Sequence, residues 1–273
     1  MENAVILSLS NGTIWGIAPG NRLALPIVSQ LTEAMQLGTF GKITHLILVS
    51  VEEESAYWTR IPSANNGTIN CPVAPPISSD ILALQMVRVA NVIALDAQRR
   101  GGLLVHGALA ERDGYGVILA GPGGIGKTTA SQRLPLPWHS LSDDTALIVR
   151  DDDGKYWGHP WPTWSRFMFG KSGGAWDVQY RVPLKGIFFL NQAQEDQATP
   201  EEPARSTCLL VEFSGKQVSR MMSYGMNQDE KRELHLNRFD NICALVQAVP
   251  CYSLHLSLTG SFWNEIERVI TGK

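Results

Sequence analysis

Residues 121–128 read Gly-Pro-Gly-Gly-Ile-Gly-Lys-Thr and match the pattern G-x-x-x-x-G-K-[ST] in full. The apolar run at 116–120 before them is typical of a short buried strand, and the residues after them are a plausible helix start. This motif constrains the fold strongly, because a strand must deliver the chain to the loop and a helix must carry it away. The sequence therefore predicts an α/β protein organised around this loop.

Each fixed position of this motif has a chemical reason. Glycines let backbone N–H groups approach phosphate oxygens with no side chain in the way, and the helix start favours bound anions. Lys127 would place a cation on the β- and γ-phosphates, and the Thr128 hydroxyl would ligate Mg²⁺. The predicted cofactors are ATP, or another nucleoside triphosphate, and Mg²⁺. The alternative is a glycine-rich turn beside an ordinary helix. The predicted cofactor-binding residues are Gly121, Gly123, Gly124, Ile125, Gly126, Lys127, Thr128 and Thr129.

An aspartate pair, Asp143 and Asp144, begins only 16 residues after Lys127, within a strand predicted over 138–149. The intervening helix must be short, because two prolines soon follow the loop. Adjacent strand residues point to opposite faces unless the strand ends there. At a strand end, one carboxylate can reach Mg²⁺ while its neighbour reaches an acceptor hydroxyl. The alternative is a solvated acidic turn, since aspartate pairs are common in turns.

His106 precedes Lys127 by 21 residues, in an apolar segment at 103–109 that predicts a buried strand. A single buried histidine is more often a hydrogen-bonded core residue than a functional one. The other five histidines show no metal-ligand spacing. Two interpretations of His106, core residue and phosphate neighbour, therefore stand side by side.

Four tryptophans and three cations lie within 157–181, where two prolines favour an extended chain. The aromatic side chains could stack on a base, grip a peptide, or cover the core, and the last interpretation is favoured. The cations could hold phosphate or lie solvated at the surface, which is the more common case. The residues concerned are Trp157, Trp161, Trp164 and Trp176, with Arg166, Lys171 and Arg181.

Two parts of the chain differ in pattern, residues 1–100 and residues 101–273. The first predicts a small N-terminal α/β lobe, and the second predicts the nucleotide-binding core. Further expectations are a hairpin turn at Asn11-Gly12, a helix at 24–36, a strand at 43–51, an irregular loop at 61–77, a helix from Ser79 or Asp80 to Arg99, a surface loop at 192–206, a helix at 228–248, a strand at 251–258 and a helix at 261–270.

Composition excludes several classes of protein. Lys and Arg number 23 against 26 Asp and Glu, so the net charge of −3 gives no footprint for nucleic acid. No apolar run is long enough to span a membrane, and no secretory start is visible. The four cysteines form no C-x-x-C pair. We expect a cytoplasmic protein with reduced thiols, no membrane partner, and an oligomeric state left open.

At this point the motifs resemble the HPr kinase/phosphorylase family. The match rests on Val105-His106-Gly107, the turn at Asp113-Gly114, the glycine-rich loop and Ser142-Asp143-Asp144, in that order and spacing. The resemblance spans roughly residues 101–190. It implies an HPr kinase-like P-loop core on a mixed sheet, in the fold shared with phosphoenolpyruvate carboxykinase. It also implies roles: Asp143 as general base, His106 near the transferred phosphate, Lys127 on the phosphates, and Asp144 with Thr128 as metal ligands.

The departures from that family are informative. The first 100 residues are shorter than the family's regulatory domain, and the stretch 182–186 lacks the glutamate of the family's L-E-x-R-G segment. This weighs against a second metal site and against phosphorylase activity. In length and at 158–164 the chain is similar to the SynChlorMet cassette protein ScmC group. Those proteins are HPr kinase-like and are associated with radical-SAM peptide-maturation cassettes. The similarity implies a peptide or small-molecule acceptor and peptide-modifying enzymes as partners.

We therefore predict a Mg-ATP-dependent kinase that transfers a phosphoryl group to a hydroxyl of a peptide, protein or small molecule, with serine as the leading acceptor. Two alternatives remain from the sequence. The chain could be a non-catalytic nucleotide-binding accessory module, or a switch driven by hydrolysis that serves a peptide-modifying partner.

Overall fold

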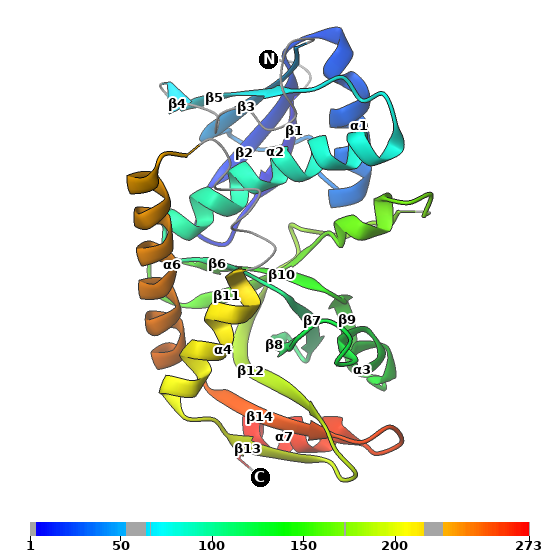
Figure 1. The fold of residues 1–273 in the computed structure, drawn as a ribbon, viewed down its shortest axis with the longest axis vertical. Helices are drawn as coiled ribbons and strands as arrows, with labels where there is room; N and C mark the ends of the chain where they lie inside the picture. Colours follow the sequence, from blue (N-terminus) through cyan, green and yellow to red (C-terminus); the bar gives the residue numbers. More distant parts are fainter. Residues whose placement is uncertain (1–3, 53–63, 66, 172, 216–225, 273) are drawn as a thin grey trace.

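Two β-sheets make up the computed structural model, which describes residues 4–52, 64–65, 67–171, 173–215 and 226–272 (Figure 1). The N-terminal sheet has the strand order β1-β2-β3-β5-β4. Its strands are β1 (Val5–Ser8), β2 (Ile14–Pro19), β3 (His45–Val51), β4 (Ala64–Asn65) and β5 (Thr68–Val73), and its helices are η1 (Arg22–Ala24), α1 (Leu25–Met35) and α2 (Ser79–Arg99).

The second sheet has the order β6-β10-β11-β12-β8-β7-β9, and β14 pairs with both β12 and β13. Strands β8, β12 and β14 are parallel neighbours, while the other pairings are antiparallel. The strands are β6 (Leu103–Val105), β7 (Gly107–Arg112), β8 (Tyr115–Ala120), β9 (His139–Ser142), β10 (Thr145–Arg150), β11 (Tyr156–Trp161), β12 (Val182–Gln192), β13 (Gln197–Pro200) and β14 (Cys251–Leu256). The helices are α3 (Lys127–Arg133), η2 (Trp164–Phe167), α4 (Pro203–Gly215), α6 (Gln228–Ala248) and α7 (Phe262–Thr271).

Helices cover both faces of the second sheet, and the alternation along β8 shows how. Ile118 belongs to a buried cluster with residues of α4 and α6, whereas Leu119 belongs to a cluster with residues of α3 and α7. Successive side chains of a strand point to opposite faces, so an almost wholly apolar strand is the pattern of a sheet covered on both sides. The predicted α/β class is confirmed, and the sheets are mixed.

Helix α2 lies between the two sheets (Figure 1). A third buried cluster joins them: it contains Trp15 of the N-terminal sheet, Met86 of α2 and Trp161 of the second sheet. The boundary predicted near residue 100 falls between α2 and β6, where one sheet ends and the other begins. Because the cluster crosses that boundary, the division into two domains stays a prediction. None of the helices in the described part of the chain is both long and apolar enough to cross a bilayer.

Most predicted elements are present, and the hairpin turn at Asn11-Gly12 joins β1 to β2. The loop predicted at 61–77 is wrong at 64–65 and 68–73, which form β4 and β5, with β5 parallel to β3, and it is correct at 74–77. Val73 O accepts a hydrogen bond from Glu52 N, so Val73 faces β3 and the preceding Pro72 faces the other edge. On that edge β4 pairs only with Thr68 and Ile69, so the missing backbone N–H of Pro72 removes no hydrogen bond between strands. Positions 61–63 and 66 of this predicted loop lie outside the described residues.

The structure also differs from the prediction at the 192–206 loop and at the start of α2. The surface loop predicted at 192–206 contains the edge strand β13 and the start of α4. Its polar residues alternate with a buried Ala198, as expected of an edge strand with one solvated face. The cap of α2 is Ser78 rather than Ser79 or Asp80, because the Ser78 hydroxyl accepts from Ile81 N at 3.3 Å.

A buried histidine holds the N-terminal hairpin against the second sheet. His159 of β11 is fully buried, and its Nδ1 donates to Val178 O at 2.9 Å. Its Nε2 therefore accepts, from Ser10 N at 3.3 Å and Ser10 Oγ at 3.1 Å. Burial lowers the pKa of His159 from 6.5 to about 4, so the ring is neutral near pH 7.

Acid should therefore loosen this junction. The unfolded chain takes up a proton at this histidine below about pH 6.5, while the folded chain resists it down to about pH 4. The free energy of unfolding should fall by about 3 kcal/mol across that window because of this residue alone. Urea titrations of the parent and of His159→Gln at several pH values measure the slope. The variant should lack this component; an equal slope in both proteins would contradict the assignment.

Candidate functional site

The glycine-rich loop joins the end of β8 to the start of α3 and leaves an open surface above it. Gly124 and Gly126 have φ of 81° and 105°, in the left-handed region that favours glycine. A Cβ placed on Gly123, Gly124 or Gly126 would meet no atom within 4 Å. Helix α3 ends at Arg133, before the two prolines, as its predicted shortness requires. The loop is thus bare backbone facing open space, as an anion-binding turn requires.

Lys127 begins α3, yet its side chain folds back into the loop. The residue is only 5% exposed. Its ammonium donates to Gly121 O at 2.9 Å, to Pro122 O at 3.0 Å and to His106 Nε2 at 2.8 Å. Burial lowers the pKa of Lys127, and the negative charge of Asp144 opposes that shift. All its donors are satisfied by groups of the site, so the cation is already held at the loop.

His106 lies where the predicted strand at 103–109 is interrupted. The chain leaves β6, which pairs with β10, and enters β7, which pairs with β8 and β9. The backbone N–H of His106 donates to Phe213 O of α4 at 2.9 Å. Since Nε2 accepts from Lys127, the ring hydrogen belongs on Nδ1, which lies 3.4 Å from Asp144 Oδ1 but makes no hydrogen bond. Burial lowers the pKa of His106, Asp144 raises it, and Lys127 lowers it.

The aspartate pair occupies a second interruption, between β9 and β10, so the predicted strand at 138–149 is two strands. Its two carboxylates turn to different partners. Asp144 faces His106, whereas Asp143 accepts from Thr163 Oγ1 at 3.0 Å and from the Arg166 guanidinium. The side chain of Asp143 is 13% exposed and that of Asp144 is 26% exposed. The structure therefore brings Lys127, His106 and Asp144 together, and directs Asp143 toward a different wall.

The oxygen donors beside the loop suit a hard divalent cation. Thr128 and Thr129 are exposed in the first turn of α3, next to Lys127. In the described ranges no group of three or more His, Cys, Asp or Glu side chains could hold a metal by itself. A Mg²⁺ ion usually takes one or two protein oxygens and completes its shell with phosphate and water. Two buried polar atoms of the site, His106 Nδ1 and Ser142 Oγ, lack hydrogen-bond partners, which is typical of a site that awaits a polar ligand.

The sequence did not identify the partners of Asp143. The sequence predicts only a phosphate clamp or a surface cation at Arg166 and no role for Thr163, whereas both contact Asp143. Both belong to the aromatic segment, in which Trp161 and Trp176 are buried as the favoured interpretation requires. No spacing rule connects residue 143 with residue 166. The interleaved cations and aromatic residues were the available signal, because an arginine often stacks on a ring while it binds a carboxylate.

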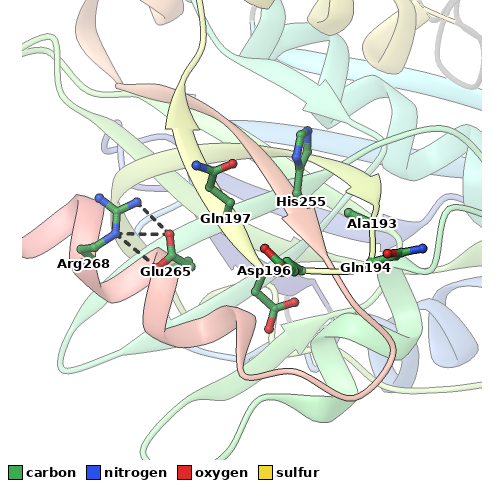
Figure 2. Close-up of a pocket in the computed structure, with 8 residues that line it drawn as sticks. Ala193, Gln194, Asp196, Gln197, His255, Glu265 and Arg268 are labelled. Atoms are coloured by element: carbon green, nitrogen blue, oxygen red, sulfur yellow. Dashed lines mark hydrogen bonds and ion pairs between the residues drawn. The ribbon is translucent and has the colours of Figure 1, made fainter.

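A separate concavity of about 730 Å³ lies at the β13 edge of the second sheet (Figure 2). Polar side chains of the 193–196 loop, β13, β14 and α7 line it, including Asp196, His255, Glu265 and Arg268. Glu265 and Arg268 already pair at 2.7 Å, and Asp196 accepts from Ser257 N at 2.6 Å. The concavity contains none of the residues predicted from the sequence, and its acids make it a poor phosphate site.

Two comparisons with known proteins agree with the motifs. The family model described as SynChlorMet cassette protein ScmC matches residues 69–271. HPr kinase/phosphorylase from three strains of Streptococcus thermophilus is 36% identical over 67 residues, which is 24% of this chain and 22% of each enzyme. The chain thus covers about a fifth of the length of these relatives. The resemblances stated from the sequence are confirmed, and the similarity to the kinases is partial.

The charges around His106 predict its tautomer and the direction in which its pKa changes in two variants, which nuclear magnetic resonance can measure. The ring should be neutral at pH 7 and carry its hydrogen on Nδ1. Asp144→Asn should lower the pKa of His106 further, because the carboxylate raises it, whereas Lys127→Met should raise it by removing a nearby cation. Long-range ¹H–¹⁵N spectra across a pH titration report both the tautomer and the pKa. An unchanged pKa of His106 in both variants would show that these three side chains are not adjacent.

Proposed function

The chain belongs to the SynChlorMet cassette protein ScmC family, and from that premise we propose that it is a Mg²⁺- and nucleotide-dependent kinase that phosphorylates a hydroxyl. The observation that carries the proposal is the assembly of Lys127, His106 and Asp144 beside an open glycine-rich loop. The partial similarity to HPr kinase/phosphorylase supports it. We further propose that the second sheet is a P-loop core of the HPr kinase type.

In this proposal the loop and Lys127 hold the triphosphate. The backbone N–H groups of Gly123, Gly124 and Gly126 would bind the phosphates, and the buried ammonium supplies a fixed positive charge at the loop. Thr128 and Asp144 are the oxygen donors we assign to Mg²⁺, which when bound would neutralise charge on the phosphates. His106 is held neutral by burial, so it offers Nδ1–H as a donor and adds no second cation beside Lys127.

Asp143 has the other task. Its carboxylate faces the Thr163 and Arg166 wall rather than Lys127, which suits a group that orients the acceptor hydroxyl. Phosphoryl transfer through a loose transition state needs alignment of the nucleophile more than its full deprotonation. A carboxylate with fixed direction and spare lone pairs can provide that alignment. We propose a serine hydroxyl of a peptide as the leading acceptor, supplied by a cassette that contains other peptide-modifying enzymes.

Nucleotide binding should depend on the cation and on the bare loop. Lys127→Ala removes the fixed positive charge at the loop and should weaken Mg-ATP binding by about 1.5–3 kcal/mol, roughly tenfold to a hundredfold in Kd. Gly123→Val should fold normally, because its Cβ meets no protein atom, yet its side chain would fill the loop. Isothermal titration measures both, with the exposed Lys155→Ala as the matched control. Parent-like affinity in both loop variants would refute the nucleotide site.

Asparagine variants of the two aspartates should impair different steps, metal-dependent nucleotide binding in one case and turnover in the other. Asp144→Asn should raise the Mg²⁺ concentration needed for nucleotide binding, since a charged ligand becomes neutral. Asp143→Asn should bind Mg-ATP like the parent and turn it over on the order of 10²-fold more slowly. Calorimetry and rates of phosphate transfer distinguish the two effects. Exchanged phenotypes would reverse the roles, and two unaffected variants would reduce the pair to a turn. Hydrolysis of ATP without phosphorylation of any acceptor would instead support the alternative of a switch driven by hydrolysis.

A further inference from the structure

Asp143 is held by a short turn from outside the glycine-rich loop. We call this turn, residues 163–167, the Arg166 turn. It follows β11 and contains η2. One oxygen of Asp143 accepts from Thr163 Oγ1 at 3.0 Å, and the other accepts from the Arg166 guanidinium. Because the two oxygens have different partners within one turn, the carboxylate plane is fixed, and each oxygen still has a lone pair free.

Arg166 is itself fixed on several sides. Its guanidinium lies 5.9 Å from the centre of the Trp176 ring, a cation–π distance. The backbone N–H of Arg166 donates to Thr163 O at 2.9 Å, and its backbone carbonyl accepts from Gly173 N at 2.7 Å. A Cβ on Gly173, whose φ is 76°, would lie 2.8 Å from the Phe167 ring, so the turn is closely packed there. The side chain is nevertheless 42% exposed, so solvent or a ligand can reach it.

The Arg166 turn is anchored in the N-terminal part of the chain. Trp164 and Phe167 pack on the hydrophobic cluster that contains residues of α1 and α2. Just beyond the turn, Phe169 N donates to Asp80 Oδ1 at the start of α2, at 2.9 Å. Trp176 N donates to Ala34 O near the end of α1, also at 2.9 Å. The N-terminal helices are thus connected through this turn to the carboxylate of Asp143.

We propose that Arg166 is a positioning residue that sets the direction of the Asp143 carboxylate, and that α1 and α2 hold Arg166 in place. The inference rests on the proposed function, in which Asp143 orients the acceptor. It gives the N-terminal helices a part in catalysis, although none of the contacts described at the glycine-rich loop involves them. A guanidinium suits this role because it can bind a carboxylate edge and stack on Trp176 at once, which an ammonium does less well.

The test compares Arg166→Ala and Arg166→Lys with the parent. Lys171→Ala, which removes an exposed cation of the same segment, is the matched control. The probes are Mg-ATP and a randomised pool of serine peptides, with phosphate transfer and phosphate release both measured. Arg166→Ala should keep the parent's Kd for Mg-ATP within about twofold while its kcat falls on the order of 10²-fold, the usual effect of a misplaced reacting group. Arg166→Lys should lie between the two.

Chemical rescue distinguishes positioning from general stability. Added guanidinium at millimolar concentration should restore part of the kcat of Arg166→Ala, and ammonium should not. A merely structural ion pair predicts a lower melting temperature, parent turnover per folded molecule and no rescue, and that result would overturn the inference. A parent that neither binds nor turns over Mg-ATP would overturn the proposed function and the inference together. A parent that transfers phosphate at the same rate as Arg166→Ala would overturn the inference alone.

The connection to α2 is tested at Asp80, far from the loop in sequence. Asp80→Ala removes the acceptor of Phe169 N, and Asp80→Asn keeps an acceptor oxygen at that position. Asp80→Ala should lower kcat severalfold with unchanged Kd for Mg-ATP, and Asp80→Asn should restore most of it. Equal kcat in the parent and Asp80→Ala would overturn the part of the proposal that assigns control of Arg166 to the N-terminal helices.

Discussion

The hydrogen bond from the Lys127 ammonium to His106 Nε2 is the contact on which the site depends. It joins the first residue of α3 to the interruption between β6 and β7, and it fixes the hydrogen of the imidazole on Nδ1, toward Asp144. The same ammonium closes the loop through two backbone carbonyls. One buried cation thus determines the shape of the loop, the tautomer of the histidine and the local electrostatics. Burial keeps the histidine neutral, so the positive charge remains on the lysine.

The sequence predicted the parts of this arrangement that depend on local physics. A complete loop motif, tight hairpin turns and apolar strand runs are short-range signals, and each led to the observed element. The interruptions at His106 and at Asp143 were not predicted, because a strand changes neighbours there for reasons of sheet topology rather than local propensity. The ion pair of Asp143 with Arg166 was missed for the same reason. A single sequence does not pair distant segments, and the aromatic and basic residues at 157–181 do not by themselves identify Asp143 as a partner.

Strand order places the glycine-rich loop and the aspartate pair at the ends of different strands of the second sheet. The glycine-rich loop follows β8, the aspartate pair joins β9 at one edge of the sheet to β10 near the other, and β12 and β14 are the parallel neighbours of β8. The aromatic segment is more than a cover for the core, since it also supplies the wall against which Asp143 rests.

Transfer of a phosphoryl group from a nucleotide to a hydroxyl at this site can be followed with an isotope label. The full chain is incubated with serine-containing peptides and Mg-ATP that carries ¹⁸O in its γ-phosphoryl group, and the products are identified by mass spectrometry. We expect a peptide that gains one phosphoryl group with the label retained, and no gain with the Lys127→Ala variant. Labelled inorganic phosphate alone, or a phosphopeptide formed equally well by that variant, would contradict the proposed transfer.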